Sequence, residues 1–335
     1  MNRLKLSLML FAAPLLLASQ NVIGQSKPTY SVGSAQFCAL DDEGQANCTI
    51  TSGFERLRAP ASLPALKAIT AGDTHACGIS VEGAAVCWGD NVYGQLDLPS
   101  ISAPLVKINA GANHTCALDT AGAAVCWGLN GNTQTDPPEG ARFVEIDAVE
   151  NSSCGILDNG NITCWTNDGL SAHESLEGPF IDLDAQRRNV CGLTSTGEIR
   201  CFTNTNIPSA PPEGNGFTDV AVNFDAICGL SADGTLECRF EDEEDASDYP
   251  IGEQFLSIQS DETDTGFTSF FANGTSRVFG STMCGERPDG TVQCWAEGGN
   301  FPDLENENPT SQELLETVEF DLDAKIYDGN SVELF

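Results

Sequence analysis

A repeated pattern of two short apolar runs around a small turn that ends in glycine extends over most of the chain. Residues 77–87, with the sequence CGISVEGAAVC, are a representative copy. The pattern predicts a β-hairpin, because the glycine falls where a short hairpin loop needs a positive φ. Alternating segments upstream, such as residues 66–72 and 106–111, predict a further strand before the hairpin.

Paired cysteines accompany every copy of this pattern. Each copy runs cysteine, five residues, glycine, three residues, cysteine, and seven copies use all 14 cysteines of the chain. Folding a hairpin about its glycine sets the two cysteines opposite each other, where Cα atoms lie about 4.5 Å apart and a disulfide fits. Zinc binding is the competing interpretation, but zinc sites favour about two to four residues between paired cysteines, plus histidines. We therefore predict the disulfides Cys38–Cys48, Cys77–Cys87, Cys116–Cys126, Cys154–Cys164, Cys191–Cys201, Cys228–Cys238 and Cys284–Cys294.

The spacing between copies predicts the fold. The first cysteines lie 39, 39, 38, 37, 37 and 56 residues apart. A period near 38 indicates a repeat protein, and each unit has the size of one four-stranded propeller blade. We predict an all-β, seven-bladed β-propeller with one disulfide-stapled hairpin per blade. The longer sixth interval predicts an insertion around residues 239–283, and an eighth half-blade without cysteines at 267–280 is the alternative.

The two ends of the repeat region suggest how the ring closes. Residues 27–37 lead into the first hairpin without an evident upstream strand, whereas residues 315–322 resemble such a strand. Pairing the C-terminal strand with the N-terminal hairpin would close the ring and remove open sheet edges.

The N-terminus resembles a secretory signal. Arg3 and Lys5 precede an apolar stretch at residues 6–17, and small or polar residues follow. We expect a signal peptide at residues 1–24, cleaved between about residues 18 and 25, and a single propeller domain at residues 25–335. An uncleaved anchor is the alternative, but the apolar stretch is short for a membrane span. Export is consistent with the predicted disulfides, since disulfides persist in oxidising compartments.

The chain is strongly acidic. It has 49 acidic and 15 basic residues, a net charge of −34. Such a surface repels nucleic acid and anionic membranes. The charge has two interpretations: it keeps the protein soluble, or it serves to bind a cationic partner or divalent ions.

Family resemblance becomes specific in residues 65–131. The sequences AGDTHACGI, CWGDN and YGQL resemble the regulator-of-chromosome-condensation repeat, in the paired-cysteine version common in secreted bacterial proteins. The resemblance implies a seven-bladed propeller, similar in architecture to the propeller-type β-lactamase inhibitor. It allows exchange-factor activity on a small GTPase or inhibition of a secreted enzyme, but export and disulfides argue against the nuclear or cytosolic role. The match weakens downstream, where Phe202 and Arg239 replace the tryptophan that follows the second cysteine.

Catalytic motifs are absent from the sequence. We find no nucleophile elbow, phosphate-binding loop or zinc-protease helix. His75 and His114 occupy the same position in successive repeats, and we expect structural imidazoles there, with a shared ligand site as the alternative. His173 stands beside Glu174, where we expect it to be solvated.

Tryptophans follow the second cysteine in four units, and we expect them to pack between blades rather than form a binding ring. The loops after them are better binding candidates, since loops on a rigid scaffold commonly carry function. The candidate residues are Asp90, Asn91, Tyr93, Asn130, Asn167 and Asp168.

The sequence therefore predicts a secreted or periplasmic, non-enzymatic scaffold that binds another protein through rim loops. We expect no catalytic residue, no cofactor, no metal site, no nucleic acid, no membrane insertion and a monomer. One alternative is a carbohydrate-binding or carbohydrate-cleaving propeller, which would require exposed aromatics beside carboxylates on its central face. Another is a calcium-dependent adhesion module, with the acidic run at residues 241–245 as the candidate calcium loop.

Overall fold

The computed structural model describes residues 30–33, 36–41, 43–50, 55–166, 176–186, 189–203, 210–223, 226–240, 249–260, 268–272, 275–279, 282–288 and 292–296. These residues form seven three-stranded antiparallel sheets and one two-stranded sheet. The predicted all-β fold, built of repeated sheets that each contain one hairpin, is confirmed.

Each three-stranded sheet consists of one upstream strand and one hairpin. The first four sheets are β1 (Tyr30–Gly33), β2 (Gln36–Leu40) and β3 (Ala46–Ile50); β4 (Leu66–Ala71), β5 (His75–Ser80) and β6 (Ala85–Gly89); β7 (Leu105–Ala110), β8 (His114–Asp119) and β9 (Ala124–Gly128); and β10 (Phe143–Val149), β11 (Ser152–Leu157) and β12 (Ile162–Trp165). A short 3-10 helix, Glu55–Leu57, lies between the first two sheets.

The remaining sheets follow the same plan until the last. They are β13 (Phe180–Gln186), β14 (Asn189–Thr194) and β15 (Ile199–Thr203); β16 (Phe217–Val222), β17 (Ala226–Ser231) and β18 (Leu236–Phe240); and β19 (Ser257–Ser260), β22 (Thr282–Glu286) and β23 (Val292–Ala296). The separate hairpin β20 (Thr268–Ala272) and β21 (Thr275–Phe279) falls in sequence between the first and second strands of the last sheet.

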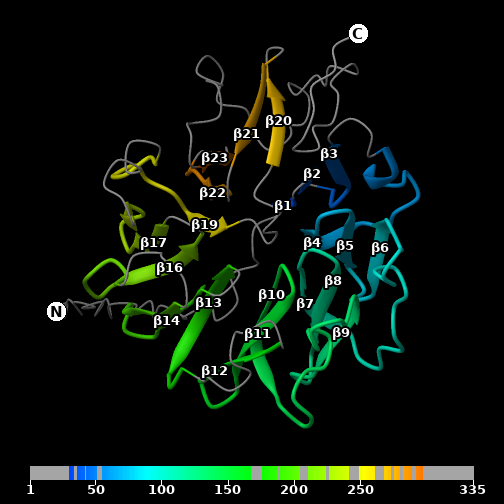
Figure 1. Ribbon diagram of the computed structural model, residues 1–335, viewed down its shortest axis with the longest axis horizontal. Coiled ribbons are helices and arrows are strands. Elements are labelled where there is room, and N and C mark those ends of the chain that lie inside the picture. Colours follow the sequence, from blue (N-terminus) through cyan, green and yellow to red (C-terminus); the bar gives the residue numbers. More distant parts are fainter. Residues whose placement is uncertain are drawn as a thin grey trace, which may run out of the picture.

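The sheets are arranged in a ring (Figure 1). The upstream strands face the centre, where each contacts the next from β1 to β19, and the third strands, such as β6, β9 and β12, lie farther out. This is the arrangement of propeller blades. The number of seven blades stays a prediction.

Disulfides join the hairpin strands at the predicted positions. Cys77, for example, stands directly opposite Cys87 in the strand register. In the first six sheets, the Cα atoms of the two bonded cysteines lie 3.9–4.1 Å apart. In the last sheet, Cys284 is disulfide-bonded, and the residue opposite it in the strand register is Cys294. The hairpin register could therefore be derived from the cysteine spacing.

The prediction that the first hairpin lacks an upstream strand is wrong. Residues 30–33 form β1, which pairs with β2 from Tyr30 opposite Ala39 to Gly33 opposite Gln36. A four-residue strand is too short to show alternation in sequence, which explains the error. The C-terminal segment 315–322, which we expected at this place, lies outside the described residues, so closure by that strand stays a prediction.

A ladder of side-chain-to-backbone hydrogen bonds connects neighbouring inner strands. In each of the first five sheets, the residue opposite the first cysteine accepts a hydrogen bond from a backbone N–H of the following sheet, at 2.6–3.2 Å. The acceptors are Ser31, Thr70, Asn109, Asp147 and Asp184. These buried bonds fix the stagger of one sheet on the next, because an unsatisfied buried N–H is costly.

The first and last sheets also touch. Gln259 of β19 donates from its side-chain amide to the Tyr30 carbonyl oxygen at 3.4 Å. Burial raises the pKa of Tyr30, and the carboxylates Glu286 and Asp219 raise it further, which places these groups near its phenol. A side-chain hydrogen bond thus bridges the seam between β1 and β19.

Hairpin turns are anchored on the following sheet. The Leu105 N–H donates to the Gly83 carbonyl at 2.8 Å, and the same bond joins Phe143 to Gly122. Gly83 has a φ of 89°, and a Cβ there would lie 2.7 Å from the Cβ of Pro104. The turn glycine is therefore required for both its conformation and its close approach to the next sheet.

Candidate functional site

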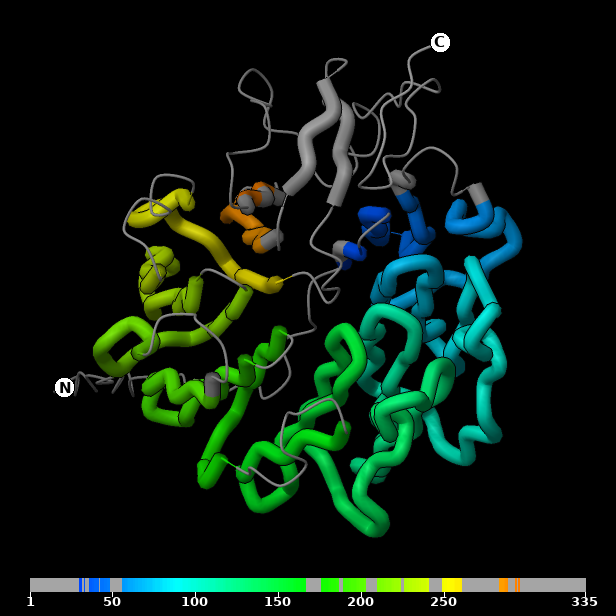
Figure 2. The backbone as a smooth tube through the Cα atoms, viewed as in Figure 1, coloured from blue at the N-terminus to red at the C-terminus, as the bar shows by residue number. Residues whose placement is uncertain are grey.

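The connections that follow the third strands of the second and third sheets contain two loops of the same design, residues 90–97 and 130–136. Figure 2 shows the connection after β6, in cyan, along the outer edge of the ring. Asn91 closes the first loop: its side-chain oxygen accepts from the Leu96 N–H at 2.8 Å, and its amide donates to Asp97 at 3.0 Å. Asn130 makes the equivalent bonds to the Thr135 N–H and to Asp136, at 3.1 and 3.0 Å.

Buried glutamines fasten these loops to the next sheet. Gln95 accepts from the Tyr93 N–H at 2.8 Å through its side chain, and its backbone carbonyl accepts from the Trp127 indole at 2.8 Å. Gln134 repeats both contacts, with the Asn132 N–H and the Trp165 indole. Each loop is thereby held by its own side chains and by the blade that follows it.

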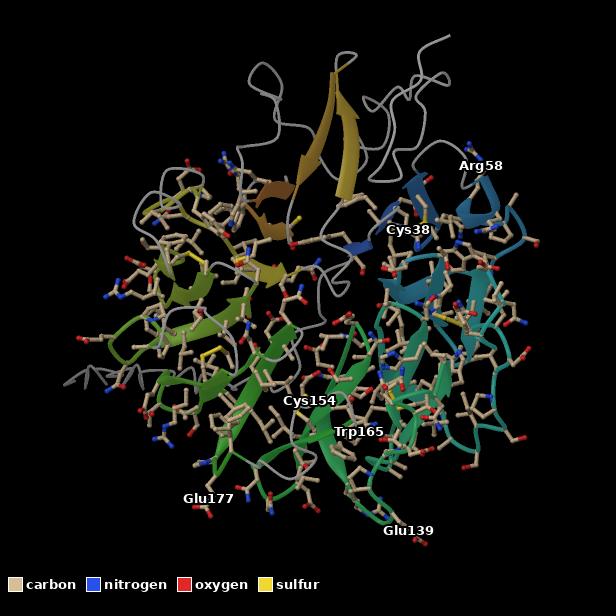
Figure 3. All side chains as sticks on the ribbon, viewed as in Figure 1. Cys38, Arg58, Glu139, Cys154, Trp165 and Glu177 are labelled. Carbon is tan, nitrogen blue, oxygen red and sulfur yellow. A yellow bond between two sulfur atoms is a disulfide. The ribbon has the colours of Figure 1, made fainter. Side chains whose placement is uncertain are left out.

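The four tryptophans are buried, with 0–5% of each side chain exposed. Trp88, Trp127 and Trp165 pack against residues of the preceding sheet and donate their indole N–H to a loop carbonyl. Figure 3 shows Trp165 within the ring beside Cys154, with Glu139 and Glu177 at the outer edge. The tryptophans therefore form packing contacts between sheets and not a binding surface.

The structure separates the predicted binding residues by role. Asn91 and Asn130 hold the loops closed, and Asp90 forms an ion pair with Arg56 at 3.3 Å on the surface. Tyr93 is 50% exposed at the tip of the first loop. Asn167 and Asp168 lie outside the described residues.

Sequence analysis missed the apolar neighbour of Tyr93. Val92 is 72% exposed, the largest value among the exposed large apolar residues of the described part of the chain. Gln95 and Gln134 were missed as well, although a signal was present, since both stand seven residues after a repeat tryptophan. The exposed tip of the first loop is therefore Val92 together with Tyr93.

The repeated histidines link neighbouring sheets. The Nε2 atoms of His75 and His114 lie 2.8 Å from the hydroxyls of Thr115 and Ser153, one sheet farther on. Ser153 gives its own proton to the Gln134 carbonyl, so His114 donates to it. Burial lowers the pKa of His75 to about 4 and that of His114 to about 3, the latter also through His75. Both imidazoles are thus neutral structural groups at neutral pH.

Carboxylates gather on the inner strands. Glu145 of β10 forms an ion pair with Lys107 of β7, the preceding inner strand. Burial raises the pKa of Asp219, and the neighbouring carboxylate Asp182 raises it further. Both oxygens of Asp219 also accept backbone bonds, from Val220 and Ile258 at 3.0 and 2.9 Å. These groups are engaged in contacts between and within strands.

Within the described residues, no three or more histidine, cysteine, aspartate or glutamate side chains are grouped so that they could hold a metal ion. The acidic run at residues 241–245 lies outside them. Nor does the described part of the chain contain a helix long and apolar enough to cross a membrane.

Comparisons with known proteins agree with this architecture. The model of the regulator of chromosome condensation (RCC1) repeat matches residues 66–95 and 105–134. The comparison with curated proteins found no matching relative.

Similar solved structures include plant receptor ectodomains. The ectodomain of the Physcomitrella patens receptor kinase CR4 is 24% identical, with a TM-score of 0.61 over 85% of this chain and 75% of that one. The CRINKLY ectodomain of Arabidopsis thaliana ACR4 is 15% identical, with a TM-score of 0.58 over 81% and 96%. Prp20p from Saccharomyces cerevisiae is 16% identical, with a TM-score of 0.54 over 67% and 74%.

At these identities the likeness concerns the fold. The repeated hairpin sheets, the ring and the matched repeats lead to one conclusion. The chain has a β-propeller-type fold, and its residues 66–95 and 105–134 match the regulator-of-chromosome-condensation repeat.

Proposed function

We propose that the chain is a secreted, non-enzymatic scaffold that binds a protein partner through its rim loops. The observation that carries this proposal is the loop at residues 90–97. Asn91 and Gln95 hold its backbone from within, while Val92 and Tyr93 project from its tip. A loop that is ordered before binding loses little conformational entropy when a partner docks.

The chemistry of the tip fits a protein surface. Tyrosine combines a large apolar contact area with a hydroxyl group, and it is enriched among residues that dominate binding energy. Asp97 lies beside the tip, Asp90 is paired with Arg56, and the net charge of the chain is −34. The partner we expect therefore presents an apolar pocket bordered by basic side chains.

The similar structures support a protein partner. Two of them are ectodomains of plant receptor kinases, and the Prp20p structure is described together with its binding to Gsp1p and histones. Binding to nucleic acid is not proposed for this chain, because its acidic surface repels phosphate.

Secretion is supported by the disulfides. Six hairpins of the described structure carry a defined disulfide, and such bonds persist in oxidising compartments. The signal-like pattern of residues 1–24 agrees with export. A monomer is proposed from charge, since two copies of so acidic a chain repel each other.

The carbohydrate alternative receives less support. It needs exposed aromatics beside carboxylates on the central face, but all four tryptophans are buried. Tyr93 is the only aromatic among the exposed large apolar side chains of the described residues, and it lies at the rim, away from the carboxylates of the inner strands. No specific observation favours the calcium-dependent alternative.

The test is affinity capture with matched variants. Oxidised mature protein, the double variant Val92→Asp/Tyr93→Ala and the control Glu139→Ala, at the outer edge, are each immobilised and exposed to extracellular and envelope proteins. We expect one protein to be retained by the wild type and by the control, and lost by the double variant. Equal retention by all three would refute a role for the loop, and retention of glycans in place of protein would favour the carbohydrate alternative.

A further inference from the structure

A second surface lies where the inner strands begin. Each of five inner strands carries a β-bulge after its first residue, so that one residue is skipped in the strand register. A bulge turns the extra side chain away from the regular alternation. Here the skipped residues are Lys67, Val106, Val144, Ile181 and Thr218.

Apolar residues at these positions are exposed to solvent. Val106, Val144 and Ile181 are 45%, 52% and 57% exposed. Leu256 is 56% exposed and stands at the equivalent place, because Phe255 before it bonds to the Gly234 turn as Phe217 bonds to Gly197. We call Val106, Val144, Ile181 and Leu256 the bulge arc.

The bulge arc lies on one face of the ring. Consecutive inner strands β7, β10 and β13 contact one another, so Val106, Val144 and Ile181 are neighbours. Leu256 follows after β16, whose equivalent residue is Thr218. The hairpin turns border the same face, since each turn glycine bonds to the start of the next inner strand. Val81 of the second turn, 57% exposed, belongs to this face and bonds through its N–H to Ala65.

The distribution is uneven enough to indicate a site. Nine large apolar residues are exposed in the described structure, and five of them, the bulge arc and Val81, share this face. Scattered exposed apolar residues need no explanation, but a patch of neighbours marks an interaction surface. The backbone at these bulges does not require an apolar side chain, because Thr218 occupies the same position in β16.

Acidic residues surround the arc. Exposed carboxylates stand in four of the hairpin turns: Glu43, Glu82, Asp158 and Asp233. The basic residues on this face are fewer. Lys67 is exposed at its own bulge position, Arg142 donates to the Ala121 carbonyl, and Arg287 pairs with Glu253. A second copy of this acidic chain is therefore a poor occupant.

We propose that the bulge arc is a second docking surface, for a basic protein segment that places aliphatic side chains on the arc and lysine or arginine against the turn carboxylates. This surface is separate from the loop tip at Val92 and Tyr93, and it does not rest on the function proposed above. Apolar contacts would supply affinity, and the surrounding charge would set orientation and association rate.

The test uses three short fluorescent peptides of equal length: alternating leucine–lysine, lysine alone, and alternating leucine–glutamate. Binding to the oxidised protein is measured by fluorescence anisotropy at low and moderate salt. We expect the leucine–lysine peptide to bind at least about tenfold more tightly than the other two. Equal binding of the leucine–lysine and lysine peptides would show charge attraction alone and would overturn the proposal.

Variants locate the site. Val144→Thr/Ile181→Thr keeps β-branched side chains on the strands while it removes apolar area. Leu98→Thr is the matched control, because Leu98 is also exposed but belongs neither to the bulge arc nor to the rim loop at residues 90–97. In the threonine variant, the dissociation constant of the leucine–lysine peptide should come to within about twofold of that of the lysine peptide. In the control variant, the difference between the two dissociation constants should stay as in the wild type. The proposal would be refuted if the threonine variant melts like the wild type and still binds the leucine–lysine peptide as much more tightly than the lysine peptide as the wild type does. Binding would then lie elsewhere.

Discussion

Single residues at the contacts between sheets respond to pH. His75 and His114 are buried, neutral and bonded to hydroxyls of the following sheet. An exposed histidine in the unfolded chain titrates near pH 6.5, whereas burial lowers the folded pKa values to about 4 and about 3. As pH falls below 6.5, the unfolded state binds protons that the folded state does not, so stability decreases with falling pH.

We predict that the unfolding free energy falls between pH 6.5 and pH 4 by up to about 1.4 kcal/mol per pH unit for each histidine. His75→Gln should reduce that slope, since Gln36 occupies the equivalent place in the first sheet and donates to the carbonyls of Gly72 and His75. The measurement is urea denaturation at a series of pH values. An identical slope in wild type and variant would contradict the assignment.

Gly83 is a second residue-scale test. Its φ of 89° and the 2.7 Å approach of an added Cβ to Pro104 both oppose a side chain. We predict that Gly83→Ala lowers the unfolding free energy by about 1–2 kcal/mol or more. Gly131→Ala is the control, because a Cβ there meets only the Leu129 side chain, at 4.0 Å. Equal effects of the two substitutions in urea denaturation would be inconsistent with this view.

At the scale of elements, the hairpin with its disulfide is the repeating unit. The sequence was sufficient to predict it, because the glycine and the cysteine spacing are local signals that fix the turn and its register. The inner strand β1 could not be recognised in four residues. The acceptors Thr70, Asn109 and Asp147 bond to donors 38–40 residues away in the next sheet. Pairing between sheets leaves no local pattern.

The candidate site was predicted in part for the same reason. The loop after Trp88 was identified from its position, and Tyr93 is exposed there. The bulge arc was missed, although doublets such as Phe143–Val144 and Phe180–Ile181 break the strand alternation. Two successive apolar residues in a strand are compatible with burial on both faces, so only the observed register shows that the second is exposed.

Removal of one disulfide tests the hairpin as an element. Cys77→Ala/Cys87→Ala should lower the unfolding free energy by about 2–3 kcal/mol, since the bond closes a short loop that the unfolded chain would otherwise leave free. Both cysteines are replaced together so that no free thiol remains. A loss below about 0.5 kcal/mol in urea denaturation would show that the bond contributes little to the fold.

At the scale of the whole molecule, we predict that the contact between the first and last sheets contributes to stability. Tyr30 is 2% exposed, and its carbonyl accepts the bond from Gln259 of the last sheet. We predict that Tyr30→Ala lowers the unfolding free energy by about 3 kcal/mol, as expected for a buried aromatic. The control Tyr93→Ala should have almost no effect, because Tyr93 is half exposed. Similar effects of both substitutions would indicate that the seam is not packed.

The measurement that tests the central claim most directly is the affinity of the captured partner for oxidised protein and for protein that has been reduced and alkylated. If seven disulfides each contribute about 2–3 kcal/mol, their loss costs about 14–21 kcal/mol, which is near or above the upper end of the roughly 5–15 kcal/mol by which a typical domain is stable. The reduced chain should then unfold and bind at least about tenfold more weakly. Equal affinity in both states would contradict the view that a disulfide-stapled propeller presents the binding loops.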